Sequence, residues 1–262
     1  MGHRHYLDQL GRSISLQQAP LRIVSLVPSQ TELLFHLGLE QQVVGITKFC
    51  IHPKQWFDAK TRVGGTKDVD VERIRLLQPD LIIANKEENT QSQIDVLAAE
   101  FPVWVSDVYN LSSALEMIQA LADITETHQK GMQLCQAIAQ GFEALLPIAE
   151  KTVVYLIWNG PYMAAGLDTF INDMLMRCGL VNCIAERRYP TLTEDALAQL
   201  APEVIVLSSE PFPFSEKHVT ALQLRHPTAK IILVDGELFS WYGSRLLAAP
   251  SYFKQIQQQL KG

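Results

Sequence analysis

Residues 22–38 read RIVSLVPSQTELLFHLG and contain one complete strand–turn–helix unit. The short apolar run RIVSLV is rich in β-branched residues and ends at Pro28, so it predicts a buried strand. Ser29 is placed to cap the helix that follows, TELLFHL, and Gly38 is placed to end it. A strand followed at once by a helix is the repeating unit of sheets whose strands run parallel.

The same alternation continues along the chain, after a small hairpin whose turn is predicted at Leu10-Gly11-Arg12. Further strands are expected at residues 43–47, 80–84, 102–106, 152–158, 204–207 and 231–234. Further helices are expected at residues 71–78, 91–100, 170–178, 193–200, 217–224 and 244–260. Strands that alternate with helices favour parallel pairing with helices on the sheet faces, so we predict an α/β fold.

One segment interrupts the alternation. Residues 112–146 contain no proline, and their apolar side chains recur at helical spacing. They predict a single long backbone helix, ended by Pro147, of about 50 Å at 1.5 Å per residue. A helix of that length suits a strut that joins two αβ lobes with parallel sheets. The expected domains are an N-terminal lobe at 1–110, the connecting helix at 111–149 and a C-terminal lobe at 150–262.

The composition limits the class of protein. Hydrophobic residues make up 47% of the chain and charged residues 19%, which is enough apolar surface for a sizeable core. The 22 Lys and Arg residues are outnumbered by 28 Asp and Glu residues, and the net charge of −6 argues against nucleic-acid binding. No apolar run approaches the ~20 residues that cross a bilayer. Four cysteines without a CxxC pair argue against a disulfide scaffold, a thioredoxin-type redox site and a zinc ribbon.

The common catalytic motifs are absent from the sequence: a phosphate-binding GxxxxGKS or GxxxxGKT loop, GxGxxG, GxSxG and HExxH. Their absence lowers the expectation of an enzyme, and no catalytic residue is assigned. Cys50 and His52 form a Cys-x-His pair, but a metal site needs three or four ligands, so no metal ligand is assigned.

The first twenty residues carry polar side chains where a secretory signal needs an apolar stretch of 7–15 residues. The sequence as written therefore predicts a cytoplasmic protein. A periplasmic location is the alternative if a leader is missing from the sequence or the start is wrongly assigned.

Aromatic residues fall where predicted strands and helices end, rather than inside them. They include Phe49, Trp56, Trp158, Tyr162, Tyr189, Phe212, Phe214, Phe239, Trp241 and Tyr242. In open α/β sheets ligands bind beyond the carboxyl ends of the strands, so these rings are expected to line a cleft between the two lobes. The alternative is that several of them anchor loops in the core.

Several segments resemble the vitamin B12-binding proteins of ABC importers, which belong to the helical-backbone metal and siderophore receptors. The resemblance covers nearly the whole chain from Leu21. It is carried by residues 21–33, Gly38, Val44-Gly45, Gly64-Gly65, Glu72-Arg73-Ile74, residues 78–84, Gly160-Pro161-Tyr162, Gly166 and residues 192–207. It implies two αβ lobes joined by one long helix, with the ligand held between the lobes.

The resemblance also implies a ligand and the residues that contact it. Five aromatic side chains fall on ligand-contacting positions or in the corresponding last loop: Phe49, Tyr162, Tyr189, Phe239 and Trp241. The implied ligand is a metal chelate, namely a corrinoid such as cobalamin, haem or a ferric siderophore, with no covalent cofactor. Thr66 and Asn85 differ from the tryptophans expected at their positions.

The implied partner is an ABC transporter permease. A weak internal repeat aligns residues 72–83 with residues 195–206, each reading helix, proline, acid and strand. In the resembling proteins a glutamate at each matched position faces arginine pockets on the transporter, so Glu72 and Asp195 are predicted docking acids. The alternative is that an acid in the first turn of a helix is favoured by the helix dipole alone.

The sequence thus predicts a monomeric substrate-binding protein that holds a metal chelate for an ABC-type importer. One alternative is a cytoplasmic enzyme acting on a corrinoid or tetrapyrrole in the same cleft. Another is an interaction or sensor module without a small ligand.

Overall fold

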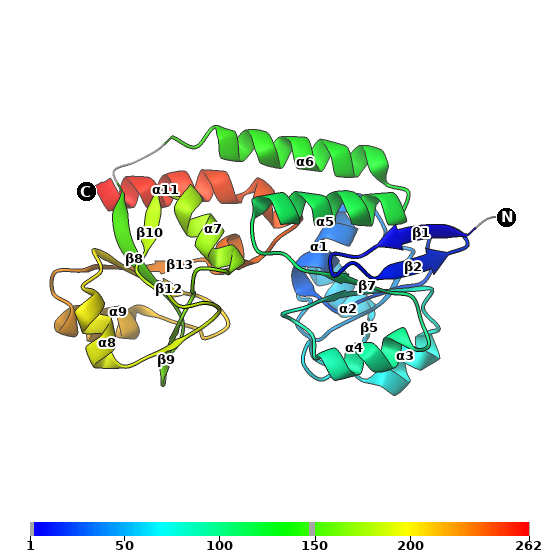
Figure 1. Ribbon diagram of the computed structural model, residues 1–262, viewed down its shortest axis with the longest axis horizontal. Helices are drawn as coiled ribbons and strands as arrows, with labels where there is room; N and C mark the ends of the chain where they lie inside the picture. The colour runs from blue at the N-terminus through cyan, green and yellow to red at the C-terminus, as the bar shows by residue number, and fades with distance from the viewer. Residues whose placement is uncertain (1–2, 147–149, 262) are drawn as a thin grey trace. The chain divides into compact units, whose positions relative to one another are not determined.

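The computed structural model describes residues 3–146 and 150–261 (Figure 1). The chain forms two compact units whose segments interleave along the sequence. Unit 1 contains the chain through Val108, Ser112–Ala137 and Tyr242–Arg245, and unit 2 contains Tyr109–Leu111, Ile138–Trp241 and the chain from Leu246. Each unit has its own sheet of mostly parallel strands, so the predicted α/β fold is confirmed. The domain boundaries drawn from the sequence stay a prediction.

The sheet of unit 1 has five parallel strands in the order β5-β4-β3-β6-β7. They are β3 (Ile23–Ser25), β4 (Val43–Ile46), β5 (Thr61–Arg62), β6 (Leu81–Asn85) and β7 (Val103–Ser106). Every residue of β3, β6 and β7 is buried, as expected for strands covered on both faces. Ile74 of α3 (Val71–Leu77) and Ile94 of α4 (Gln91–Ala98) pack in one core with strand residues Val24 and Ile82.

Helix α1 (Pro28–Leu37) follows β3 as the opening stretch predicts, but it begins differently. Val27 is the residue before the first turn, and Pro28 takes the first helical position, where its missing N–H has no intrahelical partner to lose. Ser29 therefore lies inside the helix, and the prediction that it caps the helix is wrong. Gly38 ends the helix with a left-handed φ of 85°, as predicted.

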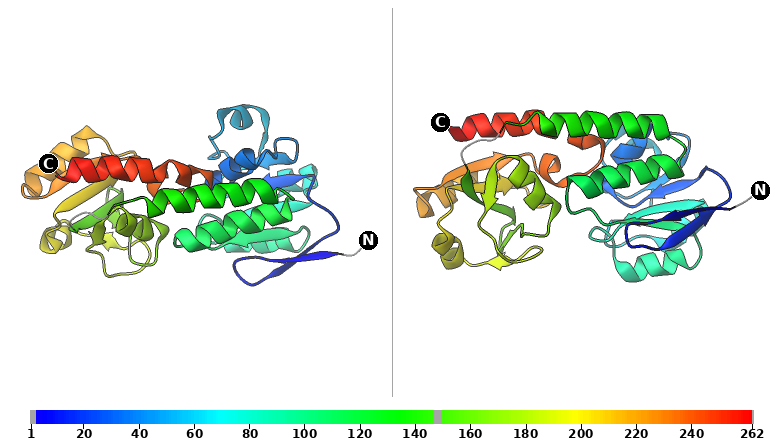
Figure 2. Two further views of the ribbon diagram at one scale, coloured as in Figure 1. Left: turned by 90° about the horizontal axis from the view of Figure 1, so that it is seen from above. Right: turned by 45° about the horizontal axis from the view of Figure 1, so that its top comes forward.

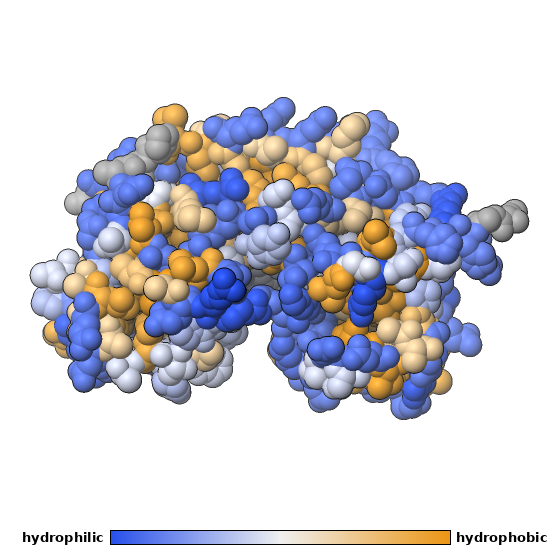
Figure 3. Space-filling view, in the orientation of Figure 1, coloured by the Kyte–Doolittle hydropathy of each residue, from blue (hydrophilic) through white to orange (hydrophobic). Residues whose placement is uncertain are grey.

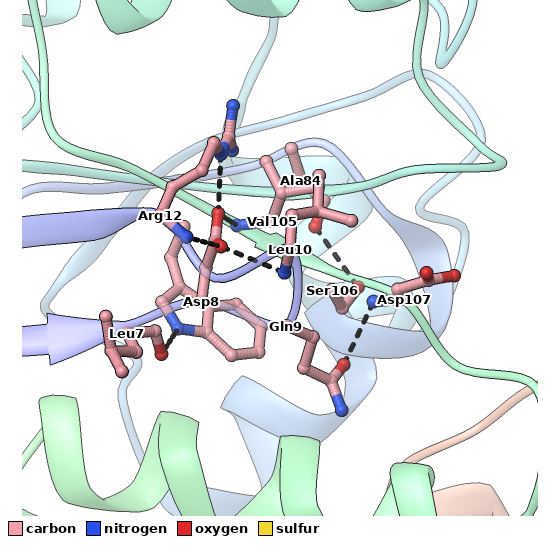
Figure 4. A network of polar contacts seen from close by, with 10 residues as sticks. Leu7, Asp8, Gln9, Leu10, Arg12, Ala84, Val105, Ser106 and Asp107 are labelled. Carbon is pink, nitrogen blue, oxygen red and sulfur yellow. Dashed lines mark hydrogen bonds and ion pairs between the residues drawn. The ribbon is translucent and has the colours of Figure 1, made fainter.

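A hairpin of β1 (Arg4–Leu7) and β2 (Ser13–Leu16) precedes the sheet, as predicted (Figure 2). Its turn lies beside the edge strand β7 (Figure 4). The buried Asp8 carboxylate accepts hydrogen bonds from two backbone N–H groups of the turn (2.8 and 2.9 Å) and from Arg12 Nε (2.8 Å). Gln9 N–H donates to a β7 carbonyl at 3.1 Å. The turn thus pairs with an edge whose backbone groups would otherwise be open.

The single helix predicted over residues 112–146 is wrong. The segment forms two helices, α5 (Leu111–Ile124) and α6 (His128–Glu143). The helix stops because Glu126 adopts a left-handed φ of 57°, and the Thr125 hydroxyl bonds back to a carbonyl of the last turn at 2.7 Å. The apolar periodicity of the sequence continues through this break, so the pattern did not reveal the break.

Helix α6 packs back against α5 within unit 1. A Cβ added to Gly131 would lie 2.3 Å from the Cβ of Ala122, so the glycine allows the close approach. Helix α6 begins in unit 1 and continues into unit 2. Pro147, the expected end of the long helix, lies outside the described residues.

The sheet of unit 2 follows the path β11-β9-β8-β12-β13, with β10 also paired to β8. Its strands are β8 (Lys151–Trp158), β9 (Tyr162–Ala164), β10 (Leu180–Asn182), β11 (Thr191–Leu192), β12 (Val204–Ser208) and β13 (Lys230–Val234). Strands β8, β10, β12 and β13 run parallel, whereas β9 and β11 extend the sheet by antiparallel pairing. The short strands β9, β10 and β11 give no periodic pattern and were not predicted.

The helices of unit 2 agree with the predicted ones in most places. They are α7 (Phe170–Arg177), α8 (Glu194–Leu200), α9 (Glu216–Arg225), α10 (Glu237–Ser240) and α11 (Ala249–Lys261). The last helix does not start at residue 244: a short 3-10 turn at Ser244–Leu247 precedes it, and Pro250 lies in its first turn. The short helices α10 and, in unit 1, α2 (Lys54–Ala59) were not predicted.

The internal repeat corresponds to equivalent local structure in the two units. Helix α3 leads into β6 and helix α8 into β12. The side chains of Asp70 and Thr193 cap the two helices by accepting a first-turn N–H, at 2.9 and 3.1 Å. Glu72 and Asp195 are consequently the second residues of matched helices, and each helix ends in a left-handed residue before a proline: Gln78 and Ala201.

Replacing Asp8 with Ala should lower the free energy of unfolding by about 1–3 kcal/mol, because partly buried donors of the turn lose their acceptor. Denaturant unfolding at neutral pH measures the change. Asp58→Ala is the control, because its side chain is 57% exposed and pairs with an exposed Lys54. It should cost under about 0.5 kcal/mol. Equal losses in the two variants would contradict a structural role for the turn.

Candidate functional site

The parallel strands of each unit end at one edge of its sheet, and the loops that follow them form what we call the carboxyl edge of that unit. Ligands of open α/β sheets bind at such edges. The five predicted ligand-contacting aromatics all come from these loops or from the elements they lead into. The two carboxyl edges differ in chemistry, and each is described in turn.

The carboxyl edge of unit 1 is organised by a buried amide. Asn85, the last residue of β6, is 2% exposed, and its Nδ2 donates to Ser106 Oγ at 2.9 Å. Its Oδ1 accepts the backbone N–H groups of Glu87 and Glu88 at 2.8 and 3.0 Å. Thr66 is 8% exposed, and its carbonyl accepts a hydrogen bond from Asn89 Nδ2 at 3.0 Å. The two positions that differ from the expected tryptophans therefore shape the loops instead of presenting rings.

Phe49 is an exposed aromatic ring at the carboxyl edge of unit 1. It lies in the loop after β4 with 51% of its surface exposed, and Lys48 Nζ lies 5.2 Å from its ring centre. The neighbouring Cys50 is fully buried, with Thr31 Oγ1 and Thr47 Oγ1 each 3.1 Å from its sulfur. Burial raises the pKa of the Cys50 thiol, so it stays protonated.

Tyr162 and Tyr189 lie on adjacent segments of unit 2. Tyr162 opens β9 and pairs in register with Leu192, and Tyr189 lies just before β11. Both rings are partly exposed. Burial and the nearby Glu194 raise the pKa of Tyr162, so its hydroxyl stays protonated at neutral pH. Arg188 lies 6.0 Å from the ring centre of Tyr189, which places a cation beside an aromatic face.

Phe239 and Trp241 are less exposed than predicted. Phe239 is 0% exposed and packs against Tyr155, Tyr252 and Phe253 with centroid distances of 5.4, 6.4 and 4.7 Å. Its ring belongs to the core of the described structure, and its assignment as a ligand contact stays a prediction. Trp241 is 7% exposed, and its Nε1 donates to Glu210 Oε1 at 3.0 Å.

Glu210 was not predicted as a site residue, but its carboxylate links two segments at the carboxyl edge of unit 2. Its Oε1 also accepts from Ser240 Oγ at 2.7 Å, so one carboxyl oxygen ties the loop after β12 to the segment after β13. Burial raises the pKa of Glu210, and the nearby carboxylates of Glu237 and Asp235 add to this effect. The hydrogen bonds from Ser240 and Trp241 lower it by less. No sequence motif marks this role, since a Glu-Pro pair after a strand is an ordinary turn signal.

The predicted docking acids are exposed on matched helices. The Glu72 side chain is 79% exposed and pairs with Arg75, which also pairs with Glu100. Glu194 pairs with Arg225, whereas the adjacent Asp195 is exposed on the first turn of α8.

Residues 3–146 and 150–261 contain neither a metal-binding cluster nor a membrane-spanning helix. No group of three or more His, Cys, Asp and Glu side chains gathers there as metal ligands. No helix within those residues is long and apolar enough to cross a membrane.

Glu210→Gln should change how stability depends on pH. The folded protein keeps Glu210 protonated above its ordinary pKa of 4.5, so wild-type stability falls as pH rises through the raised pKa. Glutamine keeps an acceptor for Ser240 and Trp241 without this charge. The variant should therefore gain stability relative to wild type as the pH rises above about 4.5, measured by denaturant unfolding. The exposed Glu186→Gln should show no such gain, and equal pH profiles for wild type and Glu210→Gln would contradict the burial argument.

Comparison with known proteins places these features in a family. The family model described as periplasmic binding protein matches residues 23–230. The uncharacterized ABC transporter substrate-binding lipoprotein YvrC of Bacillus subtilis (strain 168) is 28% identical over 213 residues, covering 76% of this chain and 67% of YvrC. The vitamin B12-binding protein of Yersinia pestis (strain Pestoides F) is 26% identical over 250 residues, covering 93% and 87%.

The fold is shared with a solved haem-binding protein. The periplasmic heme-binding protein BhuT, in complex with two hemes, superposes with a TM-score of 0.78 at 21% identity, covering 91% of this chain and 98% of BhuT. These findings confirm the resemblance stated from the sequence, and they do not support the enzyme alternative. The matched model spans well over half of the chain, so the chain belongs to the periplasmic binding protein family and is a substrate-binding protein rather than an enzyme.

Proposed function

We propose that this protein binds a metal chelate (a corrinoid, haem or a ferric siderophore) with the loops at the carboxyl edges of its two units. The observation that carries the proposal is the aromatic and cationic character of those loops in a substrate-binding protein. Phe49 and Tyr189 are exposed or partly exposed rings, each with a basic side chain beside it. Apolar rings contact a flat or greasy ligand, and the cations match carboxylate or phosphate groups on its rim.

Two further observations favour a chelate over a bare ion. The described residues offer no cluster of metal-ligating side chains, and the thiol nearest the edge of unit 1 is buried and protonated. The relatives are named for vitamin B12 and haem, which are both complexed metals in large organic frames. The ligand would then be recognised through its organic frame, and the metal would travel inside it. The expectation that it lies between two lobes stays a prediction.

The proposed partner is the permease of an ABC importer, and the proposed location is outside the cytoplasmic membrane. The family is periplasmic, and YvrC is named as an ABC transporter substrate-binding lipoprotein. Glu72 and Asp195 are the proposed docking acids. Their support is positional: both are exposed, and both are the second residue of the matched helices.

Equilibrium dialysis against cobalamin, cobinamide, haem and ferric siderophores tests the ligand. At least one chelate should bind, and Tyr189→Ala should weaken that binding about tenfold or more, because an aromatic face loses its contact. Met176→Ala is the control, since Met176 is 57% exposed on α7 and away from the proposed site. Its affinity should equal that of wild type. Failure of every chelate to bind would refute the proposed function.

Uptake of the bound chelate by cells that carry the importer tests the docking acids. Glu72→Gln and Asp195→Asn should each reduce uptake, and the double variant should reduce it most, with chelate affinity unchanged. If the acids act only through the helix dipole, each change should instead lower stability by about 0.3–1 kcal/mol and leave uptake intact. Full uptake with the double variant would therefore overturn the docking assignment.

A further inference from the structure

We propose that Trp158 is a ligand-contacting residue and that it recognises the flat conjugated face of the chelate. The inference rests on the proposed function and goes beyond the five aromatics taken from the family resemblance. Trp158 is the last residue of β8, at the carboxyl edge of unit 2, and it is 40% exposed. The described chain has three other tryptophans, and all of them are at most 7% exposed: Trp56, Trp104 and Trp241.

Exposure alone does not mark a site. Figure 3 shows apolar groups among hydrophilic ones on the surface of each unit, and isolated exposed apolar residues are ordinary. Trp158 differs because its ring joins a cluster of aromatic rings in edge-to-face contact. Its ring centre is 5.6 Å from that of Phe212 at an interplanar angle of 67°. Phe212 in turn lies 4.8 Å from Phe214 and 5.3 Å from His218.

The rings next to Trp158 are held in place by the fold. Phe214 is 7% exposed and belongs to the core of unit 2. Phe212 N–H donates to the Ile157 carbonyl at 3.3 Å, so the loop after β12 is tied to the end of β8. His218 Nδ1 accepts the Ser215 N–H at 3.0 Å, which fixes the orientation of the imidazole. The indole is therefore presented to solvent in one position, and little conformational entropy is lost when a flat ligand covers it.

The residues around Trp158 indicate the kind of ligand that would cover its ring. Trp158 pairs with Met163 in the β8–β9 hairpin, and Tyr162 lies next to Met163. The Ala164 N–H donates to the Pro190 carbonyl at 3.0 Å, which brings the segment of Tyr189 beside β9. Three partly exposed rings thus come from adjacent segments of one edge. Exposed Arg187 and Arg188 precede Tyr189, so a ligand with a flat π face and an anionic rim matches this surface.

Binding of three diamagnetic probes distinguishes a failure of the Trp158 assignment from a failure of the proposed function. The probes are cobinamide, zinc protoporphyrin and a gallium-loaded hydroxamate siderophore. For a flat probe that binds wild type, Trp158→Ala should raise the Kd about tenfold or more, and Trp158→Phe should stay within about threefold. Val181→Ala is the matched control: Val181 is 42% exposed and pairs with Thr152 at the opposite end of β8. It should bind as wild type does.

The indole N–H resonances of ¹⁵N-labelled protein give a second readout. The resonance missing from Trp158→Phe belongs to Trp158. A bound flat probe should shift it, and zinc protoporphyrin should do so most strongly because a porphyrin has a large ring current. If a flat probe binds wild type but leaves both this resonance and the Trp158→Ala affinity unchanged, the inference is overturned and the proposed function stands. Binding of the gallium siderophore alone also overturns the flat-face assignment. Binding of no probe overturns both.

Discussion

The parallel pairing of buried strands within each unit is the constraint on which the rest of the structure depends. Strands covered on both faces must satisfy their backbone groups along their length, and all of them end at the same edge. Polar side chains at the strand ends then fix the loops. Asn85 and Ser106 do this in unit 1, and Ser208 does it in unit 2, where its Oγ donates to the Glu210 carbonyl at 2.6 Å and accepts from the Tyr155 hydroxyl at 3.2 Å.

The loops at the two carboxyl edges are held in place by different interactions. The carboxyl edge of unit 1 uses a network of amides and hydroxyls and exposes the Phe49 ring. Unit 2 uses the buried carboxyl of Glu210, whose pKa is raised by burial, together with aromatic contacts, and it exposes Trp158 beside Phe212. Both arrangements are fixed before a ligand arrives, which favours binding because fewer groups must be ordered. A substrate-binding protein needs this property more than it needs reactive groups.

The sequence predicts the alternating core elements because buried strands and capped helices leave strong local patterns, as in the stretch from Arg22 to Gly38. It does not predict the break at Glu126, because a left-handed residue between two amphipathic segments leaves the apolar periodicity unchanged. The sequence marks a group of aromatic residues near the strand ends, and their contact with a ligand stays a prediction. Their exposure depends on tertiary packing, however, so Phe239 and Trp158 could not be told apart by position alone.

Hydrogen–deuterium exchange with and without the chelate that binds most tightly tests the central claim most directly, because it locates the site without mutation. We expect slower exchange in the loops at residues 47–53, 159–162 and 183–190. We expect no change in the hairpin at residues 4–16, which is held by its own contacts with β7. Protection confined to segments outside the carboxyl edges, with those loops unchanged, would contradict the central claim.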